Sequence, residues 1–177
     1  MDAAEPALDF GAALARTVAR AESYGLAVEV VDVTDPNTGD LDGRTILLDH
    51  LLTEEEKLFL LLHLFGHCVQ WNTSPEARSV GQAEFQPVTE EEYRAVFEYE
   101  KEASRFGLQL LLEAGVAGAE RWLTDLWYAD WLYLQHFYRT GERRDPGEFH
   151  RAGAHPLLDP REIPPFTPAV WPRRFAI

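Results

Sequence analysis

The chain has 177 residues, and its 16 Lys and Arg against 30 Asp and Glu give a formal net charge of −14 at pH 7. Hydrophobic residues at 46% and charged residues at 26% exclude general disorder, and the length is enough for one domain with its own core. Because so acidic a chain repels phosphate groups, we expect neither nucleic acid nor an anionic membrane as a partner.

The cysteine content and the first residues lead us to expect a cytoplasmic protein. Cys68 is the only cysteine, which excludes an intrachain disulfide and a CxxC metal or redox motif. Residues 1–6 lack the basic and apolar regions of a secretory signal. No apolar run reaches the length that a membrane-spanning helix needs.

The first fifty residues predict one helix and two strands. Residues 8–22 place apolar side chains at helical spacing, which predicts an amphipathic helix that ends near Gly25. Residues 27–33 and 44–49 are rich in Val, Ile and Leu and predict two short strands. Residues 35–40 between them are typical of a turn, so we expect the strands to be neighbours in a small hairpin or meander.

Three further helices are predicted after the strands. The first spans residues 53–71 and the second residues 89–114, and each opens with Thr-Glu-Glu-Glu, the pattern of a capping box. The first of them is apolar on nearly every side, which predicts that it is buried. The third spans residues 117–140 and is rich in Trp and Tyr. Residues 75–88 are expected to form a loop.

The last segment differs in composition, because seven of the eleven prolines follow Asp145. This density excludes a regular helix or a central strand, so we expect an extended tail that wraps over the body. Five large apolar side chains are expected to anchor it: Leu157, Leu158, Phe166, Trp171 and Phe175. The last two are also candidates to cover the aromatic helix, in which Trp127, Trp131, Leu134 and Tyr138 have the spacing of core residues.

The predicted fold class is therefore α+β. Residues 1–144 form a compact, mainly helical domain with a small β-sheet, and residues 145–177 form a Pro-rich extended tail packed on that domain. The sequence leaves the oligomeric state open.

His63 and His67 are the first candidates for chemistry, because their i, i+4 spacing places both imidazoles on one face of the buried helix. A third metal ligand could come from Glu98, Glu100 or Glu102 on the following helix. Roughly 0.2 such histidine pairs are expected by chance in this composition, so the pair alone is a weak motif. The alternative is two core histidines that hydrogen-bond to neighbouring groups.

Three segments of the chain resemble the ImmA/IrrE-type zinc metallopeptidase family. They are the strand Leu41-Asp42-Gly43-Arg44-Thr45-Ile46-Leu47-Leu48, the helix with His63-Leu64-Phe65-Gly66-His67, and the run Glu100-Lys101-Glu102-Ala103-Ser104-Arg105-Phe106. In that family a similar strand precedes a helix with HExGH and a later helix with E-x-E-A-(Asn/Asp)-x-F-A. The resemblance covers roughly residues 8–114 and implies a zincin-like domain.

The resemblance implies His63, His67 and Glu100 as zinc ligands, with Glu102 as the second choice for the third position. Leu64, however, stands where the family has its general-base Glu, and leucine cannot take a proton from the attacking water. The family's Asn or Asp is replaced by Ser104, and the LLMP that often closes the later helix is not kept.

We therefore expect a metallopeptidase-like protein that keeps a divalent metal, most simply zinc, lacks the catalytic Glu and binds a protein or peptide as a pseudo-peptidase. One alternative is an active zinc hydrolase with another base, for which Glu102, Glu54 to Glu56 and His136 are candidates, so the catalytic residue is left unassigned. Another is a metal-free structural interaction module. His150 and His155 are further possible metal donors.

Overall fold

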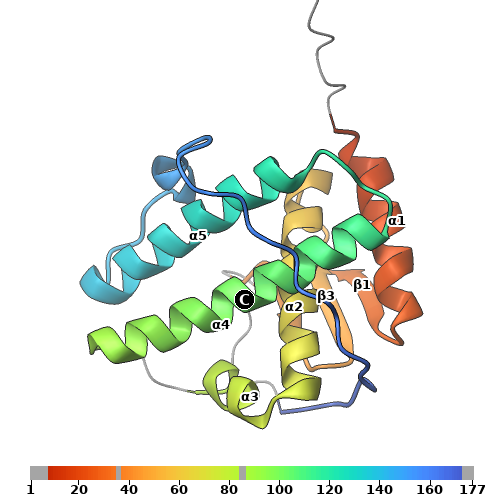
Figure 1. Ribbon diagram of the computed structural model, residues 1–177, viewed down its shortest axis with the longest axis horizontal. Coiled ribbons are helices and arrows are strands. Elements are labelled where there is room, and N and C mark those ends of the chain that lie inside the picture. The colour runs from red at the N-terminus through yellow and green to blue at the C-terminus, as the bar shows by residue number, and fades with distance from the viewer. Residues whose placement is uncertain (1–7, 35–36, 84–86, 173–177) are drawn as a thin grey trace, which may run out of the picture.

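The computed structural model describes residues 8–34, 37–83 and 87–172 (Figure 1). The fold is α+β, as predicted: mainly helical, with a small mixed sheet. In chain order the elements are α1 (Phe10–Ser23), β1 (Ala27–Val31), β2 (Gly39–Leu41), β3 (Thr45–Asp49), α2 (Glu54–Thr73), α3 (Pro75–Gly81), α4 (Glu90–Glu113), α5 (Glu120–Thr140) and the 3-10 helix η1 (Pro146–Phe149). No helix among the described residues is long and apolar enough to cross a membrane.

Local capping sets the ends of the long helices as the sequence predicted. Thr53 and Thr89 each accept a hydrogen bond from the backbone of the Glu three residues later, and that Glu side chain accepts from the Thr backbone in return. The helix α5 ends at Gly141, whose φ of 70° is a left-handed conformation that glycine adopts without steric cost.

The sheet differs from the predicted hairpin. Its strand order is β1-β3-β2, and β1 pairs with β3 in parallel, with Ala27 opposite Thr45. The antiparallel neighbour of β3 is β2, which lies in the stretch that resembled a turn. Because β2 has three residues and includes Gly39 and Asp40, it is too short to show strand alternation and its composition is that of a turn.

The predicted loop over residues 75–88 was wrong in its first part, which forms α3. Ser74 caps this helix by accepting a hydrogen bond from the backbone N–H of Ala77, and Pro75 occupies the first helical position. A capping Ser followed by Pro is a helix-start signal that the sequence carries. Residues 84–86 lie outside the described part of the chain.

The helix α2 lies at the centre of the fold, as its apolar sequence predicted. Figure 1 shows α4 crossing over it, while α1 and the sheet lie against its other sides. Every residue from Leu60 to Trp71 is buried, including Cys68, and burial raises the pKa of that thiol. Cys68 is therefore a small core residue rather than a reactive thiol.

Two glycines allow α2 and α4 to touch through their backbones. A Cβ atom on Gly66 would lie 2.0 Å from the carbonyl oxygen of Ala103, and one on Gly107 would lie 2.6 Å from that of Leu62. Real side chains do not tolerate such distances, and backbone atoms cannot rotate away. The close crossing of the two helices therefore requires glycine at both positions.

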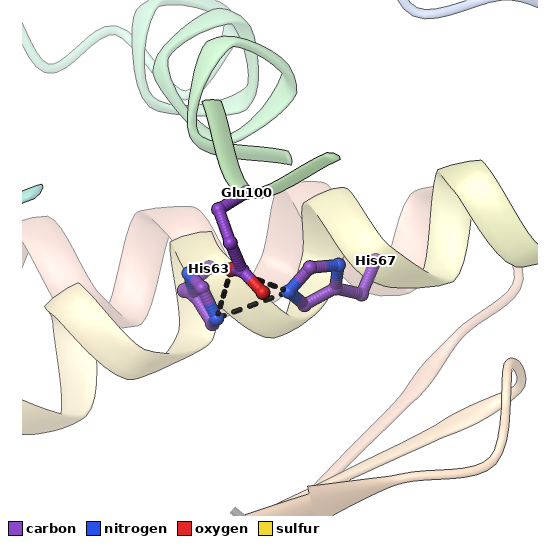
Figure 2. A group of neighbouring side chains, drawn as sticks. All are labelled: His63, His67 and Glu100. Carbon is purple, nitrogen blue, oxygen red and sulfur yellow. Dashed lines mark hydrogen bonds and ion pairs between the residues drawn. The ribbon is translucent and has the colours of Figure 1, made fainter. Parts of the chain in front are cut away.

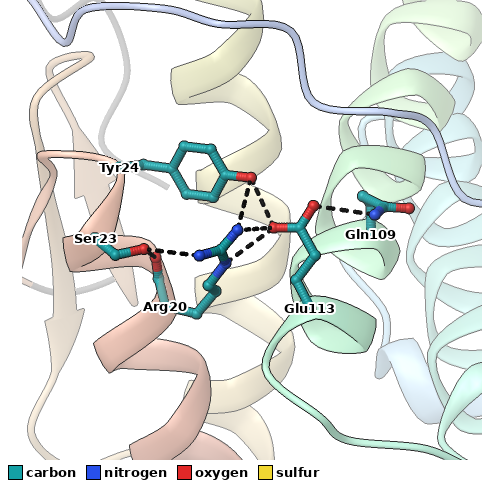
Figure 3. A network of polar contacts seen from close by, with 5 residues as sticks. All are labelled: Arg20, Ser23, Tyr24, Gln109 and Glu113. Atoms are coloured by element: carbon teal, nitrogen blue, oxygen red, sulfur yellow. Dashed lines mark hydrogen bonds and ion pairs between the residues drawn. The ribbon is translucent and has the colours of Figure 1, made fainter.

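A polar cluster also fastens α1 to the C-terminal end of α4 (Figure 3). Arg20 donates two hydrogen bonds to one carboxylate oxygen of Glu113, at 2.9 and 2.8 Å, and the Tyr24 hydroxyl donates to the same oxygen at 2.6 Å. Gln109 donates to the other oxygen. Burial favours the neutral acid, but these hydrogen bonds outweigh it and lower the pKa of Glu113.

The chain turns at residues 151–155, and from residue 156 to residue 172 it runs without helix or strand and crosses α4 (Figure 1). Leu158 is buried, as predicted, and Phe166 packs against the core, but Leu157 is 53% exposed and anchors nothing. Ile163, which the sequence analysis did not single out, is a buried anchor instead. Phe175 lies outside the described residues.

Trp171 does not cover the aromatic helix. Its ring lies over Gly43, and its indole N–H donates a hydrogen bond to the Asn72 side chain. The Arg78 guanidinium makes a cation–π contact with the same ring, 3.6 Å from its centroid. The helix α5 is covered by an earlier part of the tail, where His155 stacks on Tyr128. Within α5, Trp127 and Trp131 are buried, whereas Leu134 and Tyr138 are only half-buried.

Gly66→Ala is expected to lower the free energy of unfolding by roughly 1–3 kcal/mol or more, because the added methyl group must push α4 away from α2. Urea denaturation measures this change. Gly11→Ala is the matched control: the three atoms nearest to its methyl group would belong to the flexible end of Glu54, so no helix has to move and stability should not fall below that of the wild type. Equal stability of Gly66→Ala and wild type would contradict the required contact.

Candidate metal centre

The crossing of α2 and α4 brings His63, His67 and Glu100 together (Figure 2). The two histidines lie one turn apart on α2, and Glu100 lies one turn before Ala103, where α4 touches α2. The Nε2 atoms of the histidines are 3.0 Å apart, and Oε2 of Glu100 lies 3.4 Å from that of His63 and 3.3 Å from that of His67.

These distances fit a tetrahedral zinc ion. Zinc binds nitrogen and oxygen ligands at about 2.0–2.2 Å, and ligands at the corners of a tetrahedron then lie roughly 3.3–3.5 Å apart. Both carboxylate–imidazole distances match this value, and the imidazole–imidazole distance is slightly shorter. Two imidazoles and one carboxylate form a known zinc ligand set, which leaves a fourth position for water or another ligand.

Gln70 fixes which nitrogen of His67 faces the site. The Gln70 amide nitrogen donates to the backbone carbonyl of Tyr99 and to Oε2 of Glu102, so its oxygen is the group that lies 2.9 Å from Nδ1 of His67. That oxygen can only accept, so we assign the proton of the imidazole to Nδ1. In the neutral ring this leaves the lone pair on Nε2, which faces His63 and Glu100, as metal binding requires.

The hydrogen bonding of His63 is less complete than that of His67. The Nδ1 atom of His63 is buried and has no hydrogen-bond partner among the described residues. Burial and the neighbouring His67 lower the pKa of His63 to about 4, and the opposite effect of Glu100 is smaller. The His63 ring is therefore neutral at pH 7.

Glu100 supplies the negative charge of the site. Burial by itself would raise the pKa of this carboxyl group, but His67 and His63 outweigh that effect and lower it. The group is therefore ionised at pH 7, and its Oε2 atom lies close to the Nε2 atoms of both histidines. This combination favours a cation between the three side chains.

Glu102, the second choice for the third ligand, lies elsewhere. One of its oxygens accepts from Gln70 and the other lies 2.7 Å from Arg161 of the tail. The side chain therefore supports Gln70 and does not face the histidine pair. The sequence analysis missed Gln70 itself, although its place three residues after His67 on the same helix face is a pattern that could have been used.

A cavity of about 530 Å³ lies beside His63. Its lining side chains come from the β1–β2 connection, the start of α2, the middle of α5 and η1 with its flank: Thr38, Leu52, Glu55, Glu56, Phe59, Leu60, His63, Leu126, Ala129, Asp130, Pro146, Gly147 and His150. The metal centre is therefore bordered by a pocket of the size that usually binds ligands.

Asp130 is an acidic residue of the pocket that the sequence analysis did not name as a candidate site residue. It comes from α5, and its proximity to the triad depends on how α5 packs on α4. Burial and the charge of Glu100 raise the pKa of Asp130 to about 7, while His67 acts in the opposite direction. Strongly shifted carboxyl groups are concentrated at functional sites.

The other candidate bases have different surroundings. Glu55 and Glu56 line the pocket, but their carboxylates accept hydrogen bonds from Trp122 and from Thr53. His136 pairs with Glu142 on the surface. None of these groups is positioned beside the three donor atoms.

The remaining candidate base, Glu54, and the two further possible metal donors, His150 and His155, are not part of the three-residue group. The Glu54 carboxylate lies beside Gly11. His150 is a pocket residue, while His155 stacks on Tyr128. Neither histidine belongs to the group that converges with His63.

Leu64 occupies the position after the first histidine and is fully buried. It lies beside Gly39 of β2, within the core. No carboxylate is present there to take a proton in the site.

A second group of potential ligands, Asp32, Asp49 and His50, is better explained by the local turn. The Asp49 carboxylate accepts hydrogen bonds from the backbone N–H groups of Val33 and Leu51, and these lower its pKa. Asp32 and His50 are exposed. Asp49 therefore stabilises the backbone that follows β1 and the backbone that follows β3.

No protein-family model, no curated protein and no solved structure matches this chain.

Gln70→Leu is expected to weaken zinc binding roughly 10- to 100-fold, because His67 loses the acceptor that orients its ring. Competition with a chromophoric zinc chelator measures the affinity. Gln82→Leu is the control, since the Gln82 side chain donates a surface hydrogen bond to the carbonyl of Pro172, away from the three donor atoms. Unchanged zinc affinity in a folded Gln70→Leu variant would show that Gln70 does not support the site.

Proposed function

We propose that this chain binds a zinc ion through His63, His67 and Glu100 and acts as a catalytically impaired metallopeptidase-like protein that binds a protein or peptide. The observation that carries this proposal is the convergence of three donor atoms from two helices at the edge of a pocket. The resemblance of the three sequence segments to ImmA/IrrE-type metallopeptidases supports the peptide as ligand.

The donor set favours zinc over the other common divalent cations. Calcium and magnesium prefer sites made entirely of oxygen ligands, whereas neutral imidazole is a good ligand for zinc. His63 is a neutral ligand, the Nε2 atom of His67 faces the site, and Glu100 contributes one negative charge. The three residues would hold the ion and leave one position toward other ligands.

A bound zinc ion supplies Lewis-acid chemistry, which polarises a carbonyl group or makes water more acidic. The protein side chains do not complete a peptidase site around that chemistry. Leu64 cannot accept a proton, and loss of a general base costs about 10²–10⁴ in rate. We therefore assign the pocket to binding rather than to cleavage.

Tag-free wild-type protein, saturated with zinc and then dialysed, is expected to retain about one zinc ion per chain, as measured by elemental mass spectrometry. His63→Ala and Glu100→Gln should lose it, because each removes one of three ligands. Glu98→Gln is the matched control, since Glu98 is exposed on the same helix. Wild-type protein that retains no zinc would favour the metal-free interaction module.

Zinc-loaded wild-type protein is expected to cleave a peptide library no faster than His63→Ala, as followed by mass spectrometry of the products. Zinc-dependent cleavage would contradict the impaired peptidase and support an active hydrolase, and Asp130→Asn would then show whether the pocket carboxylate takes part. Leu64→Glu is a poor way to restore a base, because the new charge would lie in the core beside β2.

A further inference from the structure

We propose that the 530 Å³ pocket beside the metal centre binds the basic side chain, Lys or Arg, of a peptide, and that Asp130 selects for its positive charge. This inference rests on the peptide-binding function proposed above and names the class of peptide. It assigns to Asp130 a role in recognition that is separate from metal binding.

The walls of the pocket suit the aliphatic part of such a side chain. Phe59 and Leu60 of α2, Leu126 and Ala129 of α5, and Pro146 give the cavity apolar lining. The methylene groups of Lys and Arg pack well on apolar surfaces while their charged ends seek polar groups. A volume of about 530 Å³ is large enough for one such side chain and part of the neighbouring backbone.

The polar groups of the pocket are predominantly acidic. Glu55, Glu56 and Asp130 line it together with His63 and His150, and no Lys or Arg is among the lining residues that the structure describes. The two glutamates already accept hydrogen bonds from protein groups. Asp130 has no hydrogen bond or ion pair with any described residue, so its carboxylate is free to receive a donor from a ligand.

The surroundings of Asp130 make a cation the preferred partner. Asp130 lines the same pocket as the apolar side chains of Phe59, Leu126 and Ala129, and it has no cationic partner among the described residues. A Lys or Arg side chain would supply that partner and compensate for the burial of the carboxylate. An acidic side chain would add a further carboxylate to a pocket that already contains Glu55 and Glu56, so the same feature that attracts Lys and Arg rejects Asp and Glu.

The charge of the rest of the protein acts in the same direction. Residues 1–138 contain 9 basic and 25 acidic residues, a formal charge of −16. A field of this sign raises the local concentration of basic peptides and speeds their association at low salt. The contact with Asp130 would thus add to the attraction that the net negative charge exerts on any basic peptide.

The test uses four fluorescein-labelled peptide libraries with random flanking residues and a fixed central Lys, Arg, norleucine or Glu. Norleucine keeps most of the aliphatic chain of Lys and removes its charge. Fluorescence polarisation with the zinc-loaded full chain should give binding roughly tenfold or more tighter for Lys and Arg than for norleucine, and weakest for Glu. Asp130→Asn should bring Lys and norleucine to within about twofold of each other. Asp32→Asn, an exposed carboxylate outside the pocket, should keep the preference.

The inference is overturned if norleucine binds as well as Lys, if the preference survives in Asp130→Asn, or if none of the libraries binds. Zinc content is measured on the same samples. A preference for Lys and Arg in protein that holds no zinc would refute the metal assignment and leave this inference standing. Stoichiometric zinc without the preference would refute this inference alone.

Discussion

The backbone contact between α2 and α4 determines the rest of this structure. Gly66 and Gly107 let the two helices approach until a methyl group no longer fits between them. Only at that separation does the short side chain of Glu100 reach two imidazoles on the neighbouring helix, at 3.3 and 3.4 Å. Because Gly66 lies directly before His67, one segment of α2 provides both the contact surface and the ligand.

Features that depend on neighbours along the chain could be predicted from the sequence. The capping boxes at Thr53 and Thr89 and the burial of α2 follow from patterns three or four residues long. The same spacing puts His63 and His67 on one face. The resemblance added Glu100, and the structure brings it to the pair, whereas the role of all three as ligands remains a proposal.

Features that depend on packing could not be predicted in this way. The parallel pairing of β1 with β3 and the short strand β2 are set by the path of the chain over α2, which no local pattern encodes. Asp130 lies 30 residues after Glu100, and only the packing of α5 brings it near the triad. The orientation of Glu102 could not be predicted either. Its carboxylate is held by Gln70 and by Arg161, and Arg161 comes from the distant tail.

The series of polar contacts Arg161–Glu102–Gln70–His67 joins the tail to the candidate metal centre. Arg161 supplies none of the three donor atoms, but it pairs with the carboxylate that accepts a hydrogen bond from Gln70. The extended tail is therefore connected to the site indirectly, through the group that orients one imidazole ring. A substitution in the tail can thus alter the geometry of a centre that the tail does not touch.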